Sequence, residues 1–276
     1  MDFLPVDFYE QVIITRQACG LSRYMKATLP GKFGLCFDQI EEKLQYAELE
    51  IDYGKFSTCN SHAKFPKYRL KTNVVYRSYI REASSPSEDL TIRLQKFVKE
   101  PGMLSLRIFA DKISDEWVQV FSSWEVPLYI CVLYSSESIF RLLANLLQKQ
   151  QVLELSLYCA LTKEQSRLVA LFFTQPQFLL LQTKDSSAFV EIMMLYKKDP
   201  EKLMGKTVRF CRCNAIVHDN SYQRIGRVQP NWLRFQKENI VVDYYIIDKD
   251  KNALKDDEFM NSYGIAELRF LSITSV

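Results

Sequence analysis

The chain has 276 residues, of which 47% are hydrophobic and 13% aromatic, and this composition excludes a disordered protein. Its formal net charge of +3 is close to balance, so the charge of the whole molecule points to no particular class of partner. No apolar run approaches the roughly 18 residues of a membrane-spanning helix, and the acidic residues Asp2, Asp7 and Glu10 are untypical of a secretory signal.

The cysteine content indicates the compartment. There are seven cysteines, an odd number scattered without a paired pattern, which predicts free thiols in a reducing environment. We therefore expect a cytoplasmic or nuclear protein that does not associate with membranes.

Residues 1–48 predict a separate unit of three short helices. Leu4 and Pro5 open the first helix, Phe8 and Val12 lie on its apolar stripe, and Gly20 ends it. The second helix is expected near residues 21–29, and the third has the apolar stripe Phe33, Phe37, Ile40 and Leu44. Three short helices bury little surface alone, so this unit must pack on the rest of the chain or on a partner.

Residues 49–276 predict a β/α repeat domain. A strand is expected at 49–53, one or two more between 68 and 80, and a helix at 90–98 that ends before Pro101 and Gly102. From residue 103 to 214, strands and amphipathic helices alternate at a nearly constant step, which is typical of a repeat protein. The expected strands are 104–109, 128–134, 153–159, 178–183 and 207–213.

The helix starts support this phasing. Ser114, Ser135, Thr162 and Ser186 each occupy a possible N-cap position, and Gln165 three residues after Thr162 predicts a capping box. After residue 214 the period is lost. Strands are expected at 232–235, 240–247 and 265–273, the first two forming a hairpin, and this part is expected to close the end of the sheet as an irregular cap.

The strand pattern favours one fold class but leaves a second open. Leu153, Leu155 and Leu157 form an aliphatic face, whereas the alternating residues between and after them are polar or amphipathic, which predicts a sheet with helices on one face only. This favours an α/β, leucine-rich-repeat-like solenoid with a curved, mostly parallel sheet. Residues 128–133 are apolar throughout, however, which fits a doubly wound sheet covered on both faces.

The whole chain resembles F-box proteins, in particular the nematode families that join an F-box to leucine-rich-repeat-like domains. Leu4 and Pro5 match the opening of the F-box motif, and Phe8, Val12 and Ile13 match its first helical face. The resemblance implies a non-catalytic subunit that recognises substrates for a ubiquitin ligase and that contacts a Skp-type adaptor through Leu4, Pro5, Phe8 and Val12. A repeat scaffold whose helical unit is only a structural cap is the alternative.

A target protein would bind to the polar face of the sheet, because the inner face of a solenoid is extended and free of helices. The residues expected there are Arg107, Glu154, Tyr158, Gln182 and Arg209.

Nucleic-acid binding is a second hypothesis. Basic and aromatic residues alternate at 55–81, and a further basic stretch runs from 206 to 234. The competing interpretation of the first stretch is a strand with its aromatic side chains in the core and its basic side chains in solvent.

Motifs for catalysis or metal binding are weak. Cys211 and Cys213 lack two further metal ligands nearby, and Cys59 near His62 lacks an orienting group. The calcium-loop pattern that begins at Asp248 fails at Ala253 and Phe259. We therefore predict no metal, no cofactor and no enzymatic activity.

Overall fold

The structure of the chain is a computed structural model that describes residues 44–61, 68–78, 85–98, 103–211, 221–229, 232–246 and 264–271. The predicted adaptor-binding residues Leu4, Pro5, Phe8 and Val12 lie outside these ranges. The chain is an α/β protein that divides into two compact units, Met1–Tyr129 (unit 1) and Ile130–Val276 (unit 2).

Unit 1 contains a sheet of mixed direction. Its strands are β1 (Leu44–Asp52), β2 (Lys55–Ser61), β3 (Tyr68–Ser78) and β4 (Met103–Ala110), in the order β2-β1-β3-β4. The pairs β1–β3 and β3–β4 are parallel, whereas β1 and β2 form an antiparallel hairpin. The two hairpin residues, Tyr53 and Gly54, both have positive φ angles, which matches the right-handed twist of the strands that they join.

The start of β1 corrects the sequence analysis. Leu44 lies in β1 rather than in the predicted third helix, and β1 runs across residue 48, the predicted end of the helical unit. Leu44 is in parallel register with Tyr68, so the ladder to β3 stabilises an extended backbone where the apolar spacing favoured a helix.

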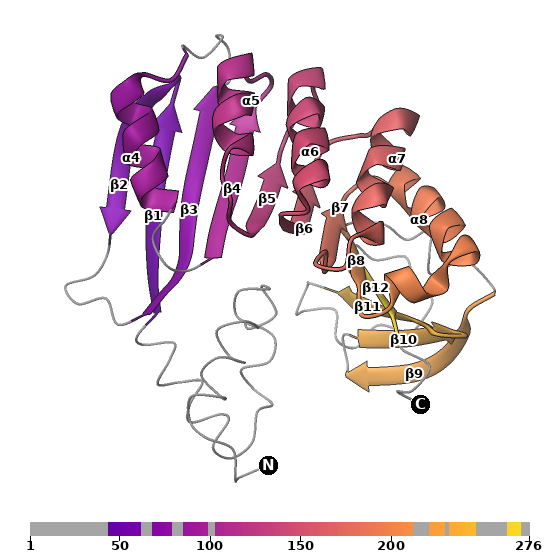
Figure 1. Cartoon of the computed structure of the whole chain (residues 1–276). Coiled ribbons are helices and arrows are strands. Elements are labelled where there is room, and N and C mark those ends of the chain that lie inside the picture. Colours follow the sequence, from indigo (N-terminus) through magenta and orange to yellow (C-terminus); the bar gives the residue numbers. More distant parts are fainter. Residues whose placement is uncertain are drawn as a thin grey trace. The chain divides into compact units, whose positions relative to one another are not determined.

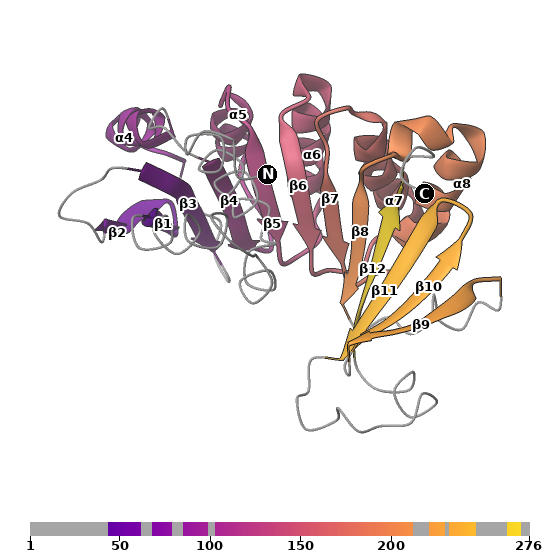
Figure 2. The same cartoon turned by 90° about the horizontal axis from the view of Figure 1, so that it is seen from below.

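Two helices, α4 (Glu88–Val98) and α5 (Asp115–Ser122), lie on one face of the unit 1 sheet (Figure 1 and Figure 2). An aromatic cluster joins α5 to this face: the ring centroid of Tyr76 is 5.1 Å from that of Trp117 and 5.7 Å from that of Phe121. Tyr76 is fully buried, and burial raises the pKa of its hydroxyl. Trp124 extends the cluster, its ring centroid lying 5.1 Å from that of Phe121.

Unit 2 begins inside strand β5 (Leu128–Val132) and continues with three parallel strands. These are β6 (Val152–Leu157), β7 (Leu180–Thr183) and β8 (Thr207–Cys211). Between them run α6 (Glu137–Lys149), α7 (Lys163–Leu171) with the 3-10 turn η1 (Phe172–Thr174), and α8 (Ser187–Lys198) with η2 (Pro200–Leu203). The predicted alternation of strands and helices is confirmed.

An antiparallel meander extends the sheet of unit 2. Its strands are β9 (Gln223–Gln229), β10 (Trp232–Lys237), β11 (Ile240–Ile246) and β12 (Gly264–Phe270). Each pairs with the next, and β12 returns to pair with β8, so the order from β6 is β6-β7-β8-β12-β11-β10-β9. The predicted hairpin is confirmed, with Glu238 at positive φ in its turn. None of the helices that the structure describes combines the length and the apolar character needed to cross a membrane.

The helices of unit 2 also lie on one face of its sheet (Figure 1 and Figure 2). Rings of α8 contact this face, because Phe189 packs at right angles on Phe210 of β8 and Tyr196 packs on Phe270 of β12. One row of buried apolar side chains crosses six strands beneath the helices: Leu155, Leu181, Val208, Leu268, Val242 and Phe235. Since successive residues of a strand point to opposite faces, the residues that alternate with this row face away from the helices.

The predicted N-caps are confirmed in part. Thr162 and Gln165 form the capping box of α7. The N-cap of α6 is Ser136 rather than Ser135, whose hydroxyl instead donates to the side chain of Gln165. Ser114 and Ser186 are the N-cap residues of α5 and α8, as predicted, but neither makes a side-chain capping bond. At the start of α8 the carboxylate of Asp185 accepts a hydrogen bond from the amide of Ser187.

Tyr76 provides a test of the packing of unit 1. Its hydroxyl is buried and has no hydrogen-bond partner among the residues that the structure describes. Tyr76→Phe keeps the ring contacts and removes this group, so we expect the free energy of unfolding to stay the same or to rise by about 1–2 kcal/mol. Urea unfolding followed by tryptophan fluorescence measures the change, since Trp117 and Trp124 lie in the same cluster. A loss of more than about 1 kcal/mol would mean that the hydroxyl is hydrogen-bonded.

Candidate functional site

The face of the unit 2 sheet that points away from the helices carries a line of polar residues, which we call the polar row. Cross-strand register places its members side by side on six strands: Ser156, Gln182, Arg209, Glu267, Asp243 and Arg234. This row alternates with the buried apolar row that faces the helices, so one sheet separates a hydrophobic core from a charged surface.

Asp243 is the most buried member of the polar row. Its side chain is fully buried, and each of its oxygens accepts a hydrogen bond from Arg234, at 2.7 Å from Nε and 3.1 Å from Nη2. The guanidinium of Arg269, which lies two residues after Glu267 on β12, forms a further ion pair with the same carboxylate. The hydrogen bond with Asp243 raises the pKa of Arg234. One buried carboxylate therefore fixes two arginines.

Glu267 does the same for Arg209. Its Oε2 accepts hydrogen bonds from Nη2 of Arg209 at 2.9 Å and from Nε at 3.2 Å. Burial alone would lower the pKa of Arg209, but the negative charge of Glu267 outweighs it and the pKa is raised. Nη1 of Arg209 lies 3.4 Å from Oε1 of Gln182, whose amide donates to the hydroxyl of Tyr158. A continuous polar network thus runs from the end of β6 to β12.

Aromatic rings flank the polar row. The rings of Trp232 and Tyr245 pack with their centroids 4.9 Å apart, and the guanidinium of Arg234 lies 5.3 Å from the ring centroid of Trp232. Beside β6, the ammonium of Lys184 lies 5.2 Å from the ring centroid of Tyr158. Burial, reinforced by the charges of Glu267 and Asp243, raises the pKa of Tyr245.

The burial of these groups determines what the face can offer a ligand. Both carboxylates are buried, whereas the side chains of Arg234 and Arg269 are 30% and 36% exposed and Lys184 is exposed. The accessible chemistry is therefore guanidinium and ammonium donors next to flat aromatic surfaces. Arginine, tryptophan and tyrosine are also the residue types that most often dominate binding energy at protein interfaces.

The predicted target-binding residues fall into two groups. Tyr158, Gln182 and Arg209 are brought together in one hydrogen-bonded network, and Glu154 lies on the same face two residues before Ser156. Arg107 belongs to unit 1, where it lies half-buried on β4 and in register with Val75. On the same face of that sheet Arg77 forms an ion pair with Glu50 at 2.9 Å.

The sequence analysis missed several important residues of this face. Asp243, Glu267, Arg269, Trp232 and Tyr245 were not selected, and Arg234 was noted only as part of a basic stretch. The sequences of β10 and β11 contain a signal for two of them, because apolar and charged residues alternate there. Arg234 lies between Leu233 and Phe235, and Asp243 lies between Val242 and Tyr244. That pattern places them opposite the core, but it does not reveal that they meet.

The structure also places several residues of the proposed nucleic-acid stretches. Tyr76 lies in the core rather than on a surface where a base could stack. Arg209 and Arg234 are paired with buried carboxylates. Lys206 is buried, and its ammonium donates to the carbonyl oxygens of Phe173 and Gln175 at 2.5 and 2.7 Å, so it caps the carboxyl end of η1.

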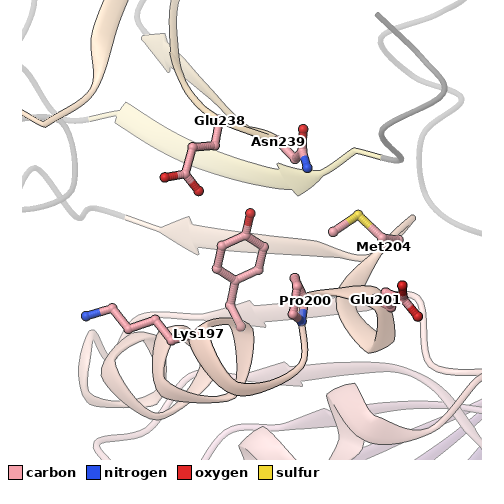
Figure 3. Close-up of a pocket in the computed structure, with 7 residues that line it drawn as sticks. Lys197, Pro200, Glu201, Met204, Glu238 and Asn239 are labelled. Carbon is pink, nitrogen blue, oxygen red and sulfur yellow. The ribbon is translucent and has the colours of Figure 1, made fainter.

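A pocket of about 650 Å³ lies on the helix side of unit 2, between the end of α8 and the β10–β11 turn (Figure 3). Lys197, Pro200, Glu201 and Met204 line it from one side, and Glu238 and Asn239 from the other. Tyr196 completes the lining, and burial together with the charge of Glu238 raises its pKa. The pocket is separate from the polar row, which lies on the opposite face.

The remaining sequence motifs are outside the described residues in whole or in part. This holds for His62, for Cys213 and for the acidic loop that begins at Asp248. Within the described ranges no group of three His, Cys, Asp or Glu side chains is arranged to hold a metal ion.

No protein-family model matches the chain, and neither a curated protein nor a solved structure does.

Asp243 provides a test of the organisation of the polar row. Asp243→Asn removes the negative charge between Arg234 and Arg269 and leaves two half-buried guanidinium groups without it. We expect the free energy of unfolding of unit 2 to fall by about 1–3 kcal/mol, less than for a fully buried ion pair that loses one partner, because both guanidinium groups reach solvent. Urea unfolding of wild type and variant measures this change in the free energy of unfolding. Asp199→Asn, which breaks an exposed pair with Lys202, is the control and should change stability little. Equal effects of the two variants would contradict the assigned role of Asp243.

Lys206 provides a test based on pH. Burial lowers its pKa to about 8, below the 10.5 of an exposed lysine, so between these pH values the unfolded chain binds more protons than the folded chain. The free energy of unfolding should therefore rise by about 3 kcal/mol from pH 8 to pH 10.5, beyond the change shown by Lys206→Met. Unfolding of both proteins across this range measures the difference. The exposed Lys202→Met is the control and should keep the wild-type rise, whereas identical pH profiles for wild type and Lys206→Met would contradict the prediction.

Proposed function

We propose that the chain is a non-catalytic protein-interaction module, the substrate-recognition subunit of an SCF-like ubiquitin ligase. In this proposal residues 1–48 hold a Skp-type adaptor, and the face of unit 2 that carries the polar row holds the target protein. The module contributes no chemistry to the transfer reaction. It raises the effective concentration of the target near the ligase, as any bivalent linker does.

One observation carries the target-binding part of the proposal. Three guanidinium groups are fixed by two buried carboxylates on a sheet face that no described helix of unit 2 covers. Ion pairs placed only for stability are often no better than apolar side chains of similar volume, because desolvating the charges offsets much of their attraction. A line of charged residues across four strands is therefore better explained by a ligand that it meets.

The repeat architecture supports the same proposal. Within each unit the helices lie on one face of the sheet and leave the other face to polar side chains, as in a leucine-rich-repeat-like solenoid. We propose that the β/α repeats belong to a fold of this kind. Repeat proteins of this kind present extended surfaces and bind proteins through them.

Adaptor binding rests on the resemblance of residues 4–13 to the F-box. Cys159 is a free thiol, in keeping with the cytoplasmic or nuclear location that this role requires. Nucleic-acid binding remains the alternative, but no observation favours it, since Lys206 and Arg209 of the second basic stretch make internal contacts.

A pulldown with a purified Skp-type adaptor tests the adaptor-binding part. The full-length chain should capture the adaptor, and a variant with Leu4→Ala, Pro5→Ala and Phe8→Asp should not, because it removes the apolar face that the resemblance assigns to the contact. Circular dichroism checks that both proteins are folded.

A matched control carries equivalent changes at exposed apolar residues of unit 2, namely Leu179→Ala, Val190→Ala and Met194→Asp. It should bind the adaptor like the wild type. If the wild-type chain fails to bind the adaptor, or if both variants bind equally well, the amino-terminal unit is a structural cap and the ligase proposal is wrong.

A further inference from the structure

We infer that the polar row recognises an acidic segment of a protein, and that the guanidinium groups of Arg234 and Arg269, with the ammonium of Lys184, bind its carboxylates. This inference rests on the proposed function, because it names the kind of target that the face of unit 2 takes. Its occupant is an extended segment rich in Asp or Glu.

The negative and positive groups of this face lie at different depths. Asp243 is fully buried, and the side chain of Glu267 is only 9% exposed. Arg234 and Arg269 reach further toward solvent, and Lys184 is exposed. A partner that approaches this face meets positive groups first, although the buried carboxylates balance much of their charge. Electrostatic complementarity therefore selects a negative partner.

Asp243 uses only some of the hydrogen-bond donors of Arg234. A guanidinium carries five N–H donors, and Arg234 gives Asp243 one from Nε and one from Nη2. The Nη1 group donates to no described residue and can bind an acceptor from outside. Because the planar guanidinium matches a carboxylate in geometry, such contacts are charge-assisted and frequently bidentate.

The positive groups of this face are preorganised. A free arginine loses much side-chain entropy when it is ordered at an interface. Arg234 is already held by both oxygens of Asp243 and lies against the ring of Trp232, and Lys184 lies over the ring of Tyr158. Part of the entropic cost of ordering these side chains is therefore met during folding rather than during binding.

A glycine lies next to Arg234 on the neighbouring strand. Its neighbour in register on β9 is Gly226, so no side chain stands beside it there. A Cβ atom built on Gly226 would meet no other atom within 4 Å. No described residue therefore fills the space beside Gly226, and a carboxylate can approach Arg234 from that side.

The charge count favours a protein segment over nucleic acid. Arg209, Arg234, Arg269 and Lys184 are opposed by the carboxylates of Asp243, Glu267 and Glu154, so the positive groups exceed the negative ones by one. This small surplus suits a short acidic segment. A nucleic acid presents a phosphate at every nucleotide, and its binding depends on neutralising many of them.

Fluorescence anisotropy of the full-length chain tests the inference with three labelled probes. These are a ten-residue peptide of alternating Glu and Ser, its counterpart of alternating Lys and Ser, and a ten-nucleotide oligothymidine. We expect the Glu peptide to bind most tightly and its affinity to fall with added salt. The double variant Arg269→Gln, Lys184→Gln should weaken its binding by about tenfold or more, the usual size of a lost charge-assisted contact.

Two controls separate the loss of specific contacts from a general loss of charge or of folding. Lys163→Gln with Lys197→Gln removes the same number of charges from exposed positions on α7 and α8, and should change the affinity less than about twofold. Lys184→Gln alone changes an exposed residue and should weaken binding without affecting the fold.

The outcomes separate the inference from the proposed function. Tighter binding of the Lys peptide, lost in the double variant, would overturn the acidic assignment but keep the face as a protein-binding surface. Tighter binding of oligothymidine, lost in the double variant, would replace both proposals with nucleic-acid binding. If the double variant and the control weaken binding of the Glu peptide equally, the inference is wrong. It is also wrong if the chain binds none of the three probes. In both cases the adaptor pulldown would still decide the ligase role.

Discussion

The buried carboxylate of Asp243 is the constraint on which the charged face of unit 2 depends. It lies between the guanidinium groups of Arg234 and Arg269, on a strand whose neighbouring side chains Val242 and Tyr244 are buried in the core. A charge in this position is tolerated only when it is paired. The pairing in turn fixes both arginines. The contact that makes the buried charge tolerable therefore also holds the two guanidinium groups in position on the surface.

The sheet itself links stability to recognition. Because side chains alternate between the two faces, the apolar row beneath the helices and the polar row on the other face come from adjacent residues of the same strands. A register slip by one residue would exchange the two rows and bury the arginines under the helices. The helix contacts of Phe210 and Phe270 therefore also specify which side chains reach the opposite surface.

Much of this fold could be predicted from the sequence, because it depends on local patterns. Alternating and helical apolar spacing identified the strands and helices from β4 to β8, and the Thr162–Gln165 pair identified a cap. The errors were also local: Leu44 fits a helical stripe but pairs with Tyr68 in a sheet, and the cap of α6 is Ser136, one residue after the predicted serine. The polar row could be predicted only in part: Gln182 and Arg209 were expected on the polar face of the sheet. The ion pairs could not be predicted, since Arg209 and Glu267 are 58 residues apart and meet only through the pairing of β8 with β12.

Arginine footprinting of the full-length chain tests most directly whether the polar row is the binding surface. Phenylglyoxal modifies accessible guanidinium groups, and mass spectrometry measures the rate at each arginine with and without the Glu-containing peptide. We expect the peptide to slow modification of Arg234 and Arg269 and to leave Arg93 and Arg167, both 57% exposed and on helices, unchanged. Protection of Arg93 or Arg167 instead, or equal protection of all four, would contradict the assignment of this face.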